Sequence, residues 1–361
     1  MSEYSITSVL TNDRYLRERV DNLLIKEGIR RDANLDYTAA MLDDDYQVIA
    51  TGSCFGNTLR CMAVDSSHQG EGLMNDIVSH LIEYQYSRGN YHLFLYTKCN
   101  SARFFGSLGF TEIARVEGQI VFMENKRSGF ESYLKRLQTE TETQLAALPH
   151  IGEMSSDRKI SALVMNANPF TLGHQYLVET AAKASDLLHI FIVSEEQSLV
   201  PFAVRKRLVQ EGTAQFDNII YHDSGSYIIS SATFPAYFQK DDAAVIESQA
   251  RLDLAVFSRI ADSLGIQARF VGSEPTSVVT STYNAIMAEE LPKQGIDCCI
   301  IERKEADGKP ISASTVRKAL QQDDLALVKT LVPESTYRFF TSSEAAPIIA
   351  AIKSAGDVVH Y

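Results

Sequence analysis

The chain has 361 residues, of which 45% are hydrophobic and 22% charged, and its formal net charge is −12. This length exceeds one ordinary domain, and the composition is that of a globular protein rather than a disordered one. The acidic balance argues against a general nucleic-acid binder, and no apolar run approaches the roughly 18 residues that would span a bilayer. The first residues lack the basic region and apolar core of a secretory signal, so we expect a cytoplasmic protein that acts away from membranes.

The first segment, residues 1–126, alternates short β-type runs with helical stretches, which predicts an α+β domain. The three consecutive aspartates at 43–45 suit a solvated turn between two strands. The five cysteines show no metal-ligand spacing, so we expect no protein-held metal site. The predicted elements are strands at Tyr37–Met41, Tyr46–Thr51, Leu59–Val64 and Tyr91–Thr97, a helix ending near Arg88, and a short helix at Asn100–Ser107.

A glycine-rich loop at residues 69–74, Gln-Gly-Glu-Gly-Leu-Met, follows one of these strands and precedes the helix. Such a loop can present backbone N–H groups to an anion at a helix N-terminus. This loop and the segment 100–110 resemble the Gcn5-related N-acetyltransferase fold. The resemblance implies that a coenzyme A-like or pantetheine arm is bound by Gln69, Gly70, Gly72 and Asn100.

Phe105 departs from that resemblance, because many acetyltransferases carry at this position a tyrosine that protonates the departing thiolate. A phenyl ring cannot donate a proton. We therefore expect the domain to hold an arm whose thiol is an acceptor, rather than to release a thiol from acetyl-coenzyme A.

Residues 127–155 are charged and helix-prone, with apolar positions near helical spacing before Pro149 and Gly152 interrupt. We interpret this stretch as a helical linker. Residues 156–361 then follow a βα pattern, and strands made of continuous apolar residues are typical of a parallel sheet covered on both faces. Strands are expected at Ile160–Met165, Leu188–Val193, Asn218–Tyr221, Ala268–Val271 and Cys298–Ile301. We expect His189 to be a core histidine and the adjacent Cys298 and Cys299 to be buried in their strand.

The loop Asn166–His174 follows the first of these strands and leads into a helix. In a doubly wound sheet, ligands bind beyond the carboxyl ends of the strands. Pro169 stiffens the turn, Gly173 permits close backbone approach, and His174 would lie in the first helical turn, able to donate to phosphate. A histidine that makes only a structural hydrogen bond at a helix start is the alternative.

A second segment, Ile311–Arg317, places cap-type hydroxyl residues before another helix. The hydroxyls and the helix N-terminus suit an anion, and Arg317 can fork onto phosphate oxygens. Arg205, in a helical region after Pro201, is either a further phosphate contact or part of a solvated helix face.

The two segments together resemble the nucleotidyltransferase superfamily that carries a [HT]-x-G-H motif and a later serine-rich motif ending in arginine. Thr171 stands where histidine is commoner, and Asn168 where many members carry aspartate. The resemblance implies ATP and Mg²⁺, attack on the α-phosphate, and release of pyrophosphate. It assigns His174, Arg317 and Thr171 to catalysis and further ATP contacts to Asn168, Phe170, Gly173, Ser312, Ser314, Thr315 and Arg205.

An acetyltransferase-like domain ahead of such a nucleotidyltransferase domain resembles the citrate lyase ligase family over nearly the whole chain. The resemblance implies that acetate is activated as acetyl-adenylate and passed to the prosthetic-group thiol of the acyl-carrier subunit of citrate lyase. Acetate needs this activation because oxide is a poor leaving group and adenylate a good one. Two alternatives stay open: an adenylyltransferase that modifies a phosphorylated cofactor precursor and carries an acyl-CoA-sensing first domain, and a binding protein without activity.

Overall fold

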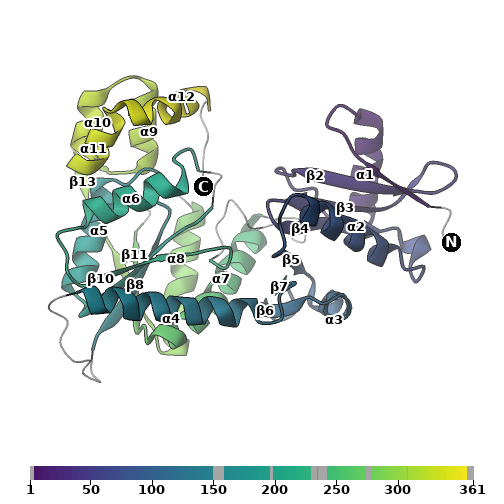
Figure 1. Cartoon of the computed structure of the whole chain (residues 1–361), viewed down its shortest axis with the longest axis horizontal. Coiled ribbons are helices and arrows are strands. Elements are labelled where there is room, and N and C mark those ends of the chain that lie inside the picture. The colour runs from purple at the N-terminus through teal and green to yellow at the C-terminus, as the bar shows by residue number, and fades with distance from the viewer. Residues whose placement is uncertain are drawn as a thin grey trace. The chain divides into compact units, whose positions relative to one another are not determined.

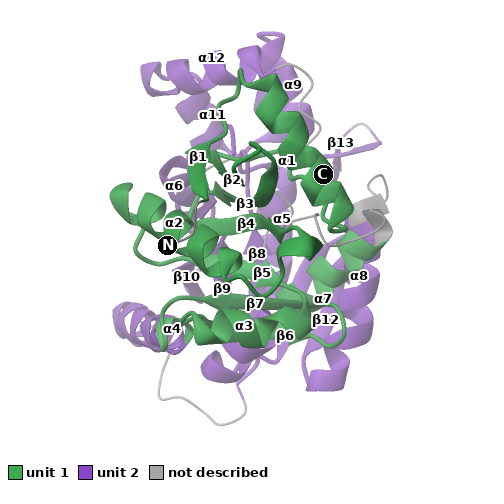
Figure 2. Ribbon diagram, turned by 90° about the vertical axis from the view of Figure 1, so that its right-hand side faces the viewer, with its two compact units in different colours: residues 1–130, 234–255 green, residues 131–233, 256–361 purple. Residues whose placement is uncertain are grey.

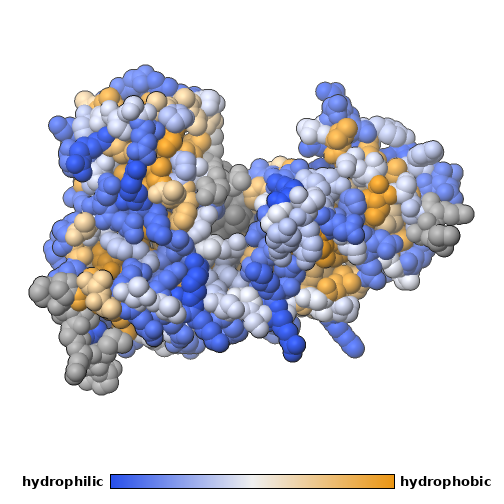
Figure 3. Space-filling model, viewed as in Figure 1, coloured by the Kyte–Doolittle hydropathy of each residue, from blue (hydrophilic) through white to orange (hydrophobic). Residues whose placement is uncertain are grey.

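The computed structural model describes residues 4–148, 158–195, 198–228, 234, 242–273, 278–306 and 308–355. The chain divides into two compact units, residues 1–130 with 234–255 and residues 131–233 with 256–361 (Figure 2). Each unit has its own sheet and its own buried core. On the face drawn in Figure 3, hydrophilic residues predominate and apolar residues lie in small groups.

The first unit is built on a seven-stranded sheet in the order β1-β2-β3-β4-β5-β7-β6. Apolar side chains of α1 pack on one face of this sheet, and those of α2 and α3 pack on the other. Its elements are β1 (Ser5–Ser8), α1 (Arg14–Lys26), β2 (Tyr37–Leu42), β3 (Val48–Phe55), β4 (Thr58–Val64), α2 (Leu73–Ser87), β5 (Phe94–Thr97), α3 (Ala102–Ser107), β6 (Thr111–Val116) and β7 (Ile120–Glu124).

Two neighbouring strands of this sheet, β4 and β5, separate along their length. They are parallel, whereas the other strand pairs of this sheet are antiparallel. Only Thr58 with Phe94 and Leu59 with Leu95 are in register, although β4 continues to Val64 and β5 to Thr97. The sheet therefore opens between the carboxyl ends of these two strands.

Residues 234–255 group with the first unit although the chain has by then entered the second. The Phe234 ring meets the Tyr96 ring edge-on at 5.6 Å, and the Ser248 hydroxyl donates to Oε1 of Gln119 at 2.6 Å. Helix α7 (Asp242–Leu264) therefore begins in the first unit and ends in the second. The sequence pattern instead predicts that residues 234–255 are part of the second domain, residues 156–361.

The second unit is a five-stranded parallel sheet in the order β10-β9-β8-β11-β12. Figure 1 shows the last four α-helices gathered at one end of this unit. Its elements are α4 (Gly129–Ala147), β8 (Ile160–Met165), α5 (Leu172–Lys183), β9 (Leu187–Ile192), α6 (Phe202–Gly212), β10 (Ile219–Asp223), α7, β11 (Ala268–Gly272), α8 (Val278–Glu290), β12 (Asp297–Ile301), β13 (Glu305–Ala306), β14 (Lys309–Pro310), α9 (Ala313–Gln321), α10 (Leu325–Leu331), α11 (Glu334–Phe340) and α12 (Ala346–Ser354).

The chain runs outward from the central strand β8 to β9 and β10, then returns to place β11 and β12 on the other side. This order creates a topological switch point between β8 and β11, where ligands bind in sheets of this kind. Both parts of the expected fold class are confirmed: an α+β unit of the acetyltransferase-like type is followed by a doubly wound parallel sheet.

Helix α4, which falls within the predicted linker, packs against the edge of the second sheet. The Gln144 side chain accepts from the backbone N–H of Tyr221 and donates to its carbonyl oxygen, both at 2.9 Å. These bonds occupy backbone groups that the edge strand β10 would otherwise expose. Residues 149–157, at the end of the predicted linker, lie outside the described residues.

The prediction for His189 is confirmed, whereas the prediction for Cys298 and Cys299 holds only in part. His189 is fully buried in β9 and its Nδ1 lies 2.9 Å from Nε2 of His222, so its prediction as a core histidine is confirmed. Cys298 and Cys299 are only half-buried, because β12 is an edge strand with no neighbour in the sheet on its outer side. They lie in the strand as expected, but the expectation that they are buried there holds only in part.

Candidate functional site

A cavity of about 440 Å³ lies at the carboxyl ends of β8, β11 and β12, at the switch point of the second sheet. Both predicted motifs contribute to its wall. The predicted residues that line it are Asn168, Thr171, Gly173, His174, Ser312, Ser314 and Arg317. The fold thus brings together, in one concave site, residues more than a hundred positions apart in the chain.

The first motif is held by a reciprocal cap at the N-terminus of α5. The His174 backbone N–H donates to Oγ1 of Thr171 at 3.3 Å, and the Thr171 backbone N–H donates to Nδ1 of His174 at 3.1 Å. A backbone N–H can only donate, so Nδ1 must be the acceptor and the proton of the neutral ring is on Nε2. Thr171 therefore fixes both the orientation and the tautomer of His174.

His174 is held in its neutral form by its surroundings. Burial, and then the positive charge of Arg303, lower the pKa of His174 to about 4. The ring stacks on Phe170, with centroids 5.8 Å apart. At neutral pH the side chain is therefore a fixed Nε2–H donor, which can stabilise charge on an oxyanion without carrying a charge itself.

The second motif forms the N-terminus of α9. The Ser312 hydroxyl accepts from the Thr315 backbone N–H at 3.1 Å and lies 2.8 Å from the Thr315 hydroxyl. Ser314 lies between them in sequence and lines the cavity, whereas Thr315, whose backbone N–H is capped by Ser312, is not among the lining residues. Of the three predicted hydroxyl contacts, only Ser312 and Ser314 therefore face the cavity.

Arg317 joins the two motifs. Its Nη1 donates to the backbone carbonyl oxygen of Asn168 at 2.6 Å, and its Nη2 donates to the Ser314 hydroxyl at 3.2 Å. The residue is only 8% exposed, and burial lowers the pKa of its guanidinium. The same side chain thus shapes the loop after β8 and brings positive charge to the wall of the cavity.

Gly173 lets the two motifs approach at the level of the backbone. A Cβ atom at this position would lie 3.0 Å from the carbonyl oxygen of Ile311 and 3.4 Å from Oγ1 of Thr171. Even the smallest side chain would therefore press the N-terminus of α5 against the start of the second motif.

Two predicted ATP contacts lie outside the cavity lining. Phe170 is fully buried in the core, where its ring supports His174. Arg205 is also fully buried, so neither a phosphate contact nor a solvated helix face describes it. Its guanidinium donates to the backbone carbonyl oxygens of Asn166, Val193, Glu195 and Val200 at 2.6–2.9 Å. It therefore holds the loops after β8 and β9 in place.

The two phosphate motifs assign no role to several residues of the lining, among them Tyr176, Glu302 and Arg303. Arg303 follows the carboxyl end of β12, and its Nε donates to the carbonyl oxygen of Ser273 at 2.7 Å. The signal that could have found the last two was their place directly after a predicted parallel strand.

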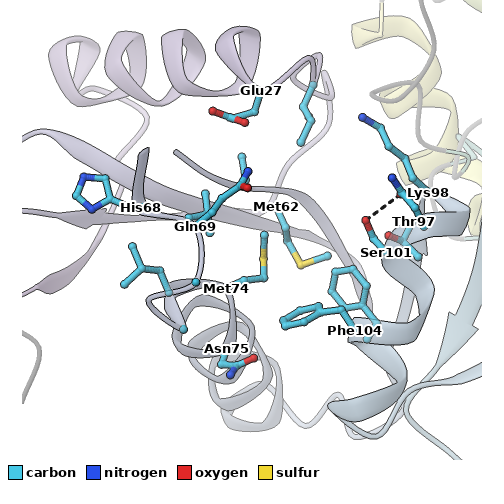
Figure 4. Close-up of a pocket in the computed structure, with 18 of the residues that line it drawn as sticks. Glu27, Met62, His68, Gln69, Met74, Asn75, Thr97, Lys98, Ser101 and Phe104 are labelled. Carbon is cyan, nitrogen blue, oxygen red and sulfur yellow. Dashed lines mark hydrogen bonds between the residues drawn. The ribbon is translucent and has the colours of Figure 1, made fainter. Parts of the chain in front are cut away.

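A second cavity, of about 700 Å³, lies in the first unit where β4 and β5 separate. Met62, Ala63 and Val64 line it from β4, and Tyr96 and Thr97 line it from β5. All four predicted arm-binding residues, Gln69, Gly70, Gly72 and Asn100, are in its lining. In Figure 4 the side chains of Met62, Met74 and Phe104 point toward one another in this cavity.

The loop at one wall of this cavity is shaped by two glycines in the left-handed region, Gly70 with φ 92° and Gly72 with φ 83°. Gly72 is the N-cap of α2, and no side chain caps the helix there. Backbone N–H groups at such an end can bind an anion. Phe105 also lines the cavity and is 4% exposed, so an apolar ring occupies the position considered for a proton donor.

None of the described helices combines the length and the apolar character needed to cross a membrane. The family model described as the citrate lyase ligase C-terminal domain matches residues 160–340. These residues contain both motifs of the second unit.

Three curated relatives are citrate (pro-3S)-lyase ligases. The protein from Klebsiella pneumoniae is 38% identical over 336 residues, which cover 91% of this chain and 94% of that protein. The relative from Haemophilus influenzae is 36% identical and covers 89% of this chain and 93% of its own length. The relative from Escherichia coli K12 is 38% identical, with 82% of each chain covered.

Solved acetyltransferase structures match about a third of the chain. An acetyltransferase of the GNAT family from Staphylococcus aureus is 14% identical, covers 34% of this chain and 99% of its own, and has a TM-score of 0.29. A putative N-acetyltransferase from Lactobacillus plantarum is 17% identical, with 34% and 97% covered and a TM-score of 0.29.

Proposed function

The chain belongs to the citrate lyase ligase family, and we propose that it uses ATP to acetylate a protein-bound thiol. In the first step, a carboxylate oxygen of acetate attacks the α-phosphorus of ATP, the bond to the bridging oxygen breaks, and pyrophosphate leaves. In the second step, a thiolate sulfur attacks the carbonyl carbon of acetyl-adenylate, and AMP leaves. The thiol is that of the pantetheine-type prosthetic group on the acyl-carrier subunit of citrate lyase.

The observation that carries this proposal is the bond from Arg317 to the Asn168 carbonyl oxygen, which makes one cavity out of two motifs. Around that cavity, His174 offers a fixed neutral donor and Arg317 a positive charge, while the N-termini of α5 and α9 offer backbone N–H groups. Positioning and charge stabilisation of this kind are what transfer of a phosphoryl-type group requires.

Mg²⁺ fits this site as an ion carried by the nucleotide. Mg²⁺ prefers oxygen ligands and commonly binds through substrate phosphates with one or two carboxylates. Among the described residues, the cavity lining contains a single carboxylate, that of Glu302. We therefore expect the phosphates of ATP to supply most of the ligands, and the ion to neutralise charge on them.

The first unit is proposed to hold the thiol-bearing arm. Its cavity combines apolar walls, which suit the pantetheine chain, with the uncapped N-terminus of α2, which suits a pyrophosphate. The apolar Phe105 is consistent with an arm whose thiol only accepts the acetyl group.

The experiment that tests the function is exchange of labelled pyrophosphate into ATP, with and without acetate. Direct acetate binding is a poor test, because four heavy atoms supply at most about 6 kcal/mol. We expect exchange that depends on acetate and proceeds without any carrier protein. Exchange that ignores acetate and requires a phosphorylated acceptor would contradict the proposal in favour of an adenylyltransferase. Absence of both exchange and AMP formation with a thiolated carrier would favour a binding protein.

A further inference from the structure

Arg303 is a positively charged residue of the cavity lining, and neither of the two phosphate motifs contains it. It lies two residues after the end of β12 and lines the same cavity as His174, Arg317 and Ser314. His174 follows the central strand β8, whereas Arg303 follows the outer strand β12, with β11 between them. The two side chains therefore reach the cavity from opposite sides of the switch point.

The structure fixes how the Arg303 side chain is held. Its Nε donates to the carbonyl oxygen of Ser273, and the Ser273 backbone N–H donates to the carbonyl oxygen of Ile301 at 2.8 Å. These two bonds connect the ends of β11 and β12 and hold the Arg303 side chain at the cavity that it lines.

The charge of Arg303 acts on His174. After burial, Arg303 is the cause that lowers the pKa of His174. Among the described residues, the charged groups that line the cavity around His174 are Arg303, Arg317 and Glu302. Because His174 stays neutral, the two arginines are the side chains of the described lining that bring positive charge to a bound triphosphate. Arg317 is already bonded to the Asn168 carbonyl and to Ser314, which limits how far it can follow the ligand.

We propose that Arg303 is a further phosphate-binding residue, which forks onto non-bridging oxygens of the triphosphate from the side opposite to Arg317. Its charge adds to the effect of burial in keeping His174 neutral. Arg303 then attracts the anion, and His174 donates a hydrogen bond to it. This inference rests on the nucleotide site proposed above, but it does not depend on acetate as the acceptor.

The test is ATP binding to the full-length chain by titration calorimetry, without acetate. Arg303→Gln removes the charge, and Lys304→Gln is the matched control, because Lys304 is the next residue, is exposed, and is not among the lining residues. Loss of a charge-assisted fork should weaken ATP binding about 10- to 100-fold in Arg303→Gln. Lys304→Gln should bind within about twofold of the parent, as expected for an exposed, screened charge. Parent-like binding by Arg303→Gln overturns the inference.

A second variant separates charge from loop geometry. Arg303→Lys keeps the positive charge but loses the Nε bond to Ser273, so it should recover part of the ATP affinity that Arg303→Gln loses. An NMR titration of His174 should show a raised pKa in Arg303→Gln and a nearly unchanged pKa in Arg303→Lys. If the two variants lose affinity equally and His174 titrates alike in both, Arg303 serves only to hold the loop and the inference fails. ATP binding lost in Arg303→Gln together with acetate-independent exchange would instead retain this inference and reject the proposed function.

Discussion

The guanidinium Nη1 of Arg317 donates to the backbone carbonyl oxygen of Asn168 at 2.6 Å, across 149 positions of the chain. Asn168 in turn holds the neighbouring loop, because its Oδ1 accepts from the Val200 backbone N–H at 3.0 Å. The loop after β8, the loop before α6 and the helix α9 are thus connected through two residues. Any change at Arg317 should affect both the charge of the cavity and its shape.

Arg317→Lys is expected to lower the rate of pyrophosphate exchange about 100-fold or more, because lysine keeps the charge but cannot make both bonds. Ser314→Ala removes only the bond to Nη2 and should have a smaller effect. Lys318→Gln, which removes an exposed charge on the same helix, should be nearly neutral. Full activity of Arg317→Lys would show that the two bonds are dispensable.

Gly173→Ala should slow exchange while changing stability little, because the added methyl group presses on the Ile311 carbonyl oxygen at 3.0 Å. The two motifs must then separate by a few tenths of an ångström, which is enough to misplace reacting groups. Gly106→Ala is the control, since a Cβ atom there meets nothing within 4 Å. Initial rates and urea unfolding of both variants check this. Equal rates in the two variants would count against the close approach.

His174→Ala should reduce the exchange rate about 100- to 1,000-fold, the usual effect of losing one charge-stabilising donor. Because the pKa of His174 is about 4, the rate should not fall through protonation of this residue as the pH drops from 8 to 6. The pKa is lower in the folded chain than in the unfolded one, so this residue destabilises the fold as pH falls through about 6.5 toward 4. Rate–pH profiles and an NMR titration test this, and a ring that titrates near 6.5 would contradict it.

Arg205→Met should lower the free energy of unfolding by about 3–5 kcal/mol, because it leaves buried carbonyl oxygens without their donor. Arg207→Met is a matched control two residues away. The Arg207 ion pair with Glu344 is solvent-exposed, and such pairs contribute about 0–1 kcal/mol. Urea unfolding of the two variants gives the comparison. Similar losses in both would mean that the buried bonds contribute little.

Gly72→Ala should impair acetyl transfer to the thiol and leave acetate-dependent exchange nearly unchanged, since it alters only the proposed arm site. Gly89→Ala provides a close control. Gly72 precedes α2 and Gly89 follows its C-cap, and their φ angles are 83° and 82°. A Cβ atom at either position would meet no atom within 4 Å. Both changes strain the backbone alike, but only Gly72 lines the cavity. AMP formation with a thiolated carrier, compared with exchange, measures the two steps. The same defect in both variants, or in both assays, would argue against a separate arm site.

The burial of Arg205 reveals a role that its sequence did not indicate. The sequence of Arg205 and its neighbours is equally compatible with a phosphate contact and with a solvated helix face, and only packing revealed a third role, in which the guanidinium binds four carbonyl groups. For Arg303, the position in the sheet is the decisive feature rather than burial. It lies outside the two phosphate motifs, and the order of the strands places it across the cavity from His174.

The sequence by itself determined the fold class and the two phosphate-type motifs, because apolar periodicity, glycines and capping residues act over a few neighbouring positions. Only the tertiary structure decided that Arg317 reaches Asn168, that Arg205 is buried, and that burial together with Arg303 keeps His174 neutral. These relationships depend on which strands become neighbours and on how far each side chain is removed from water, and neither quantity is encoded at short range.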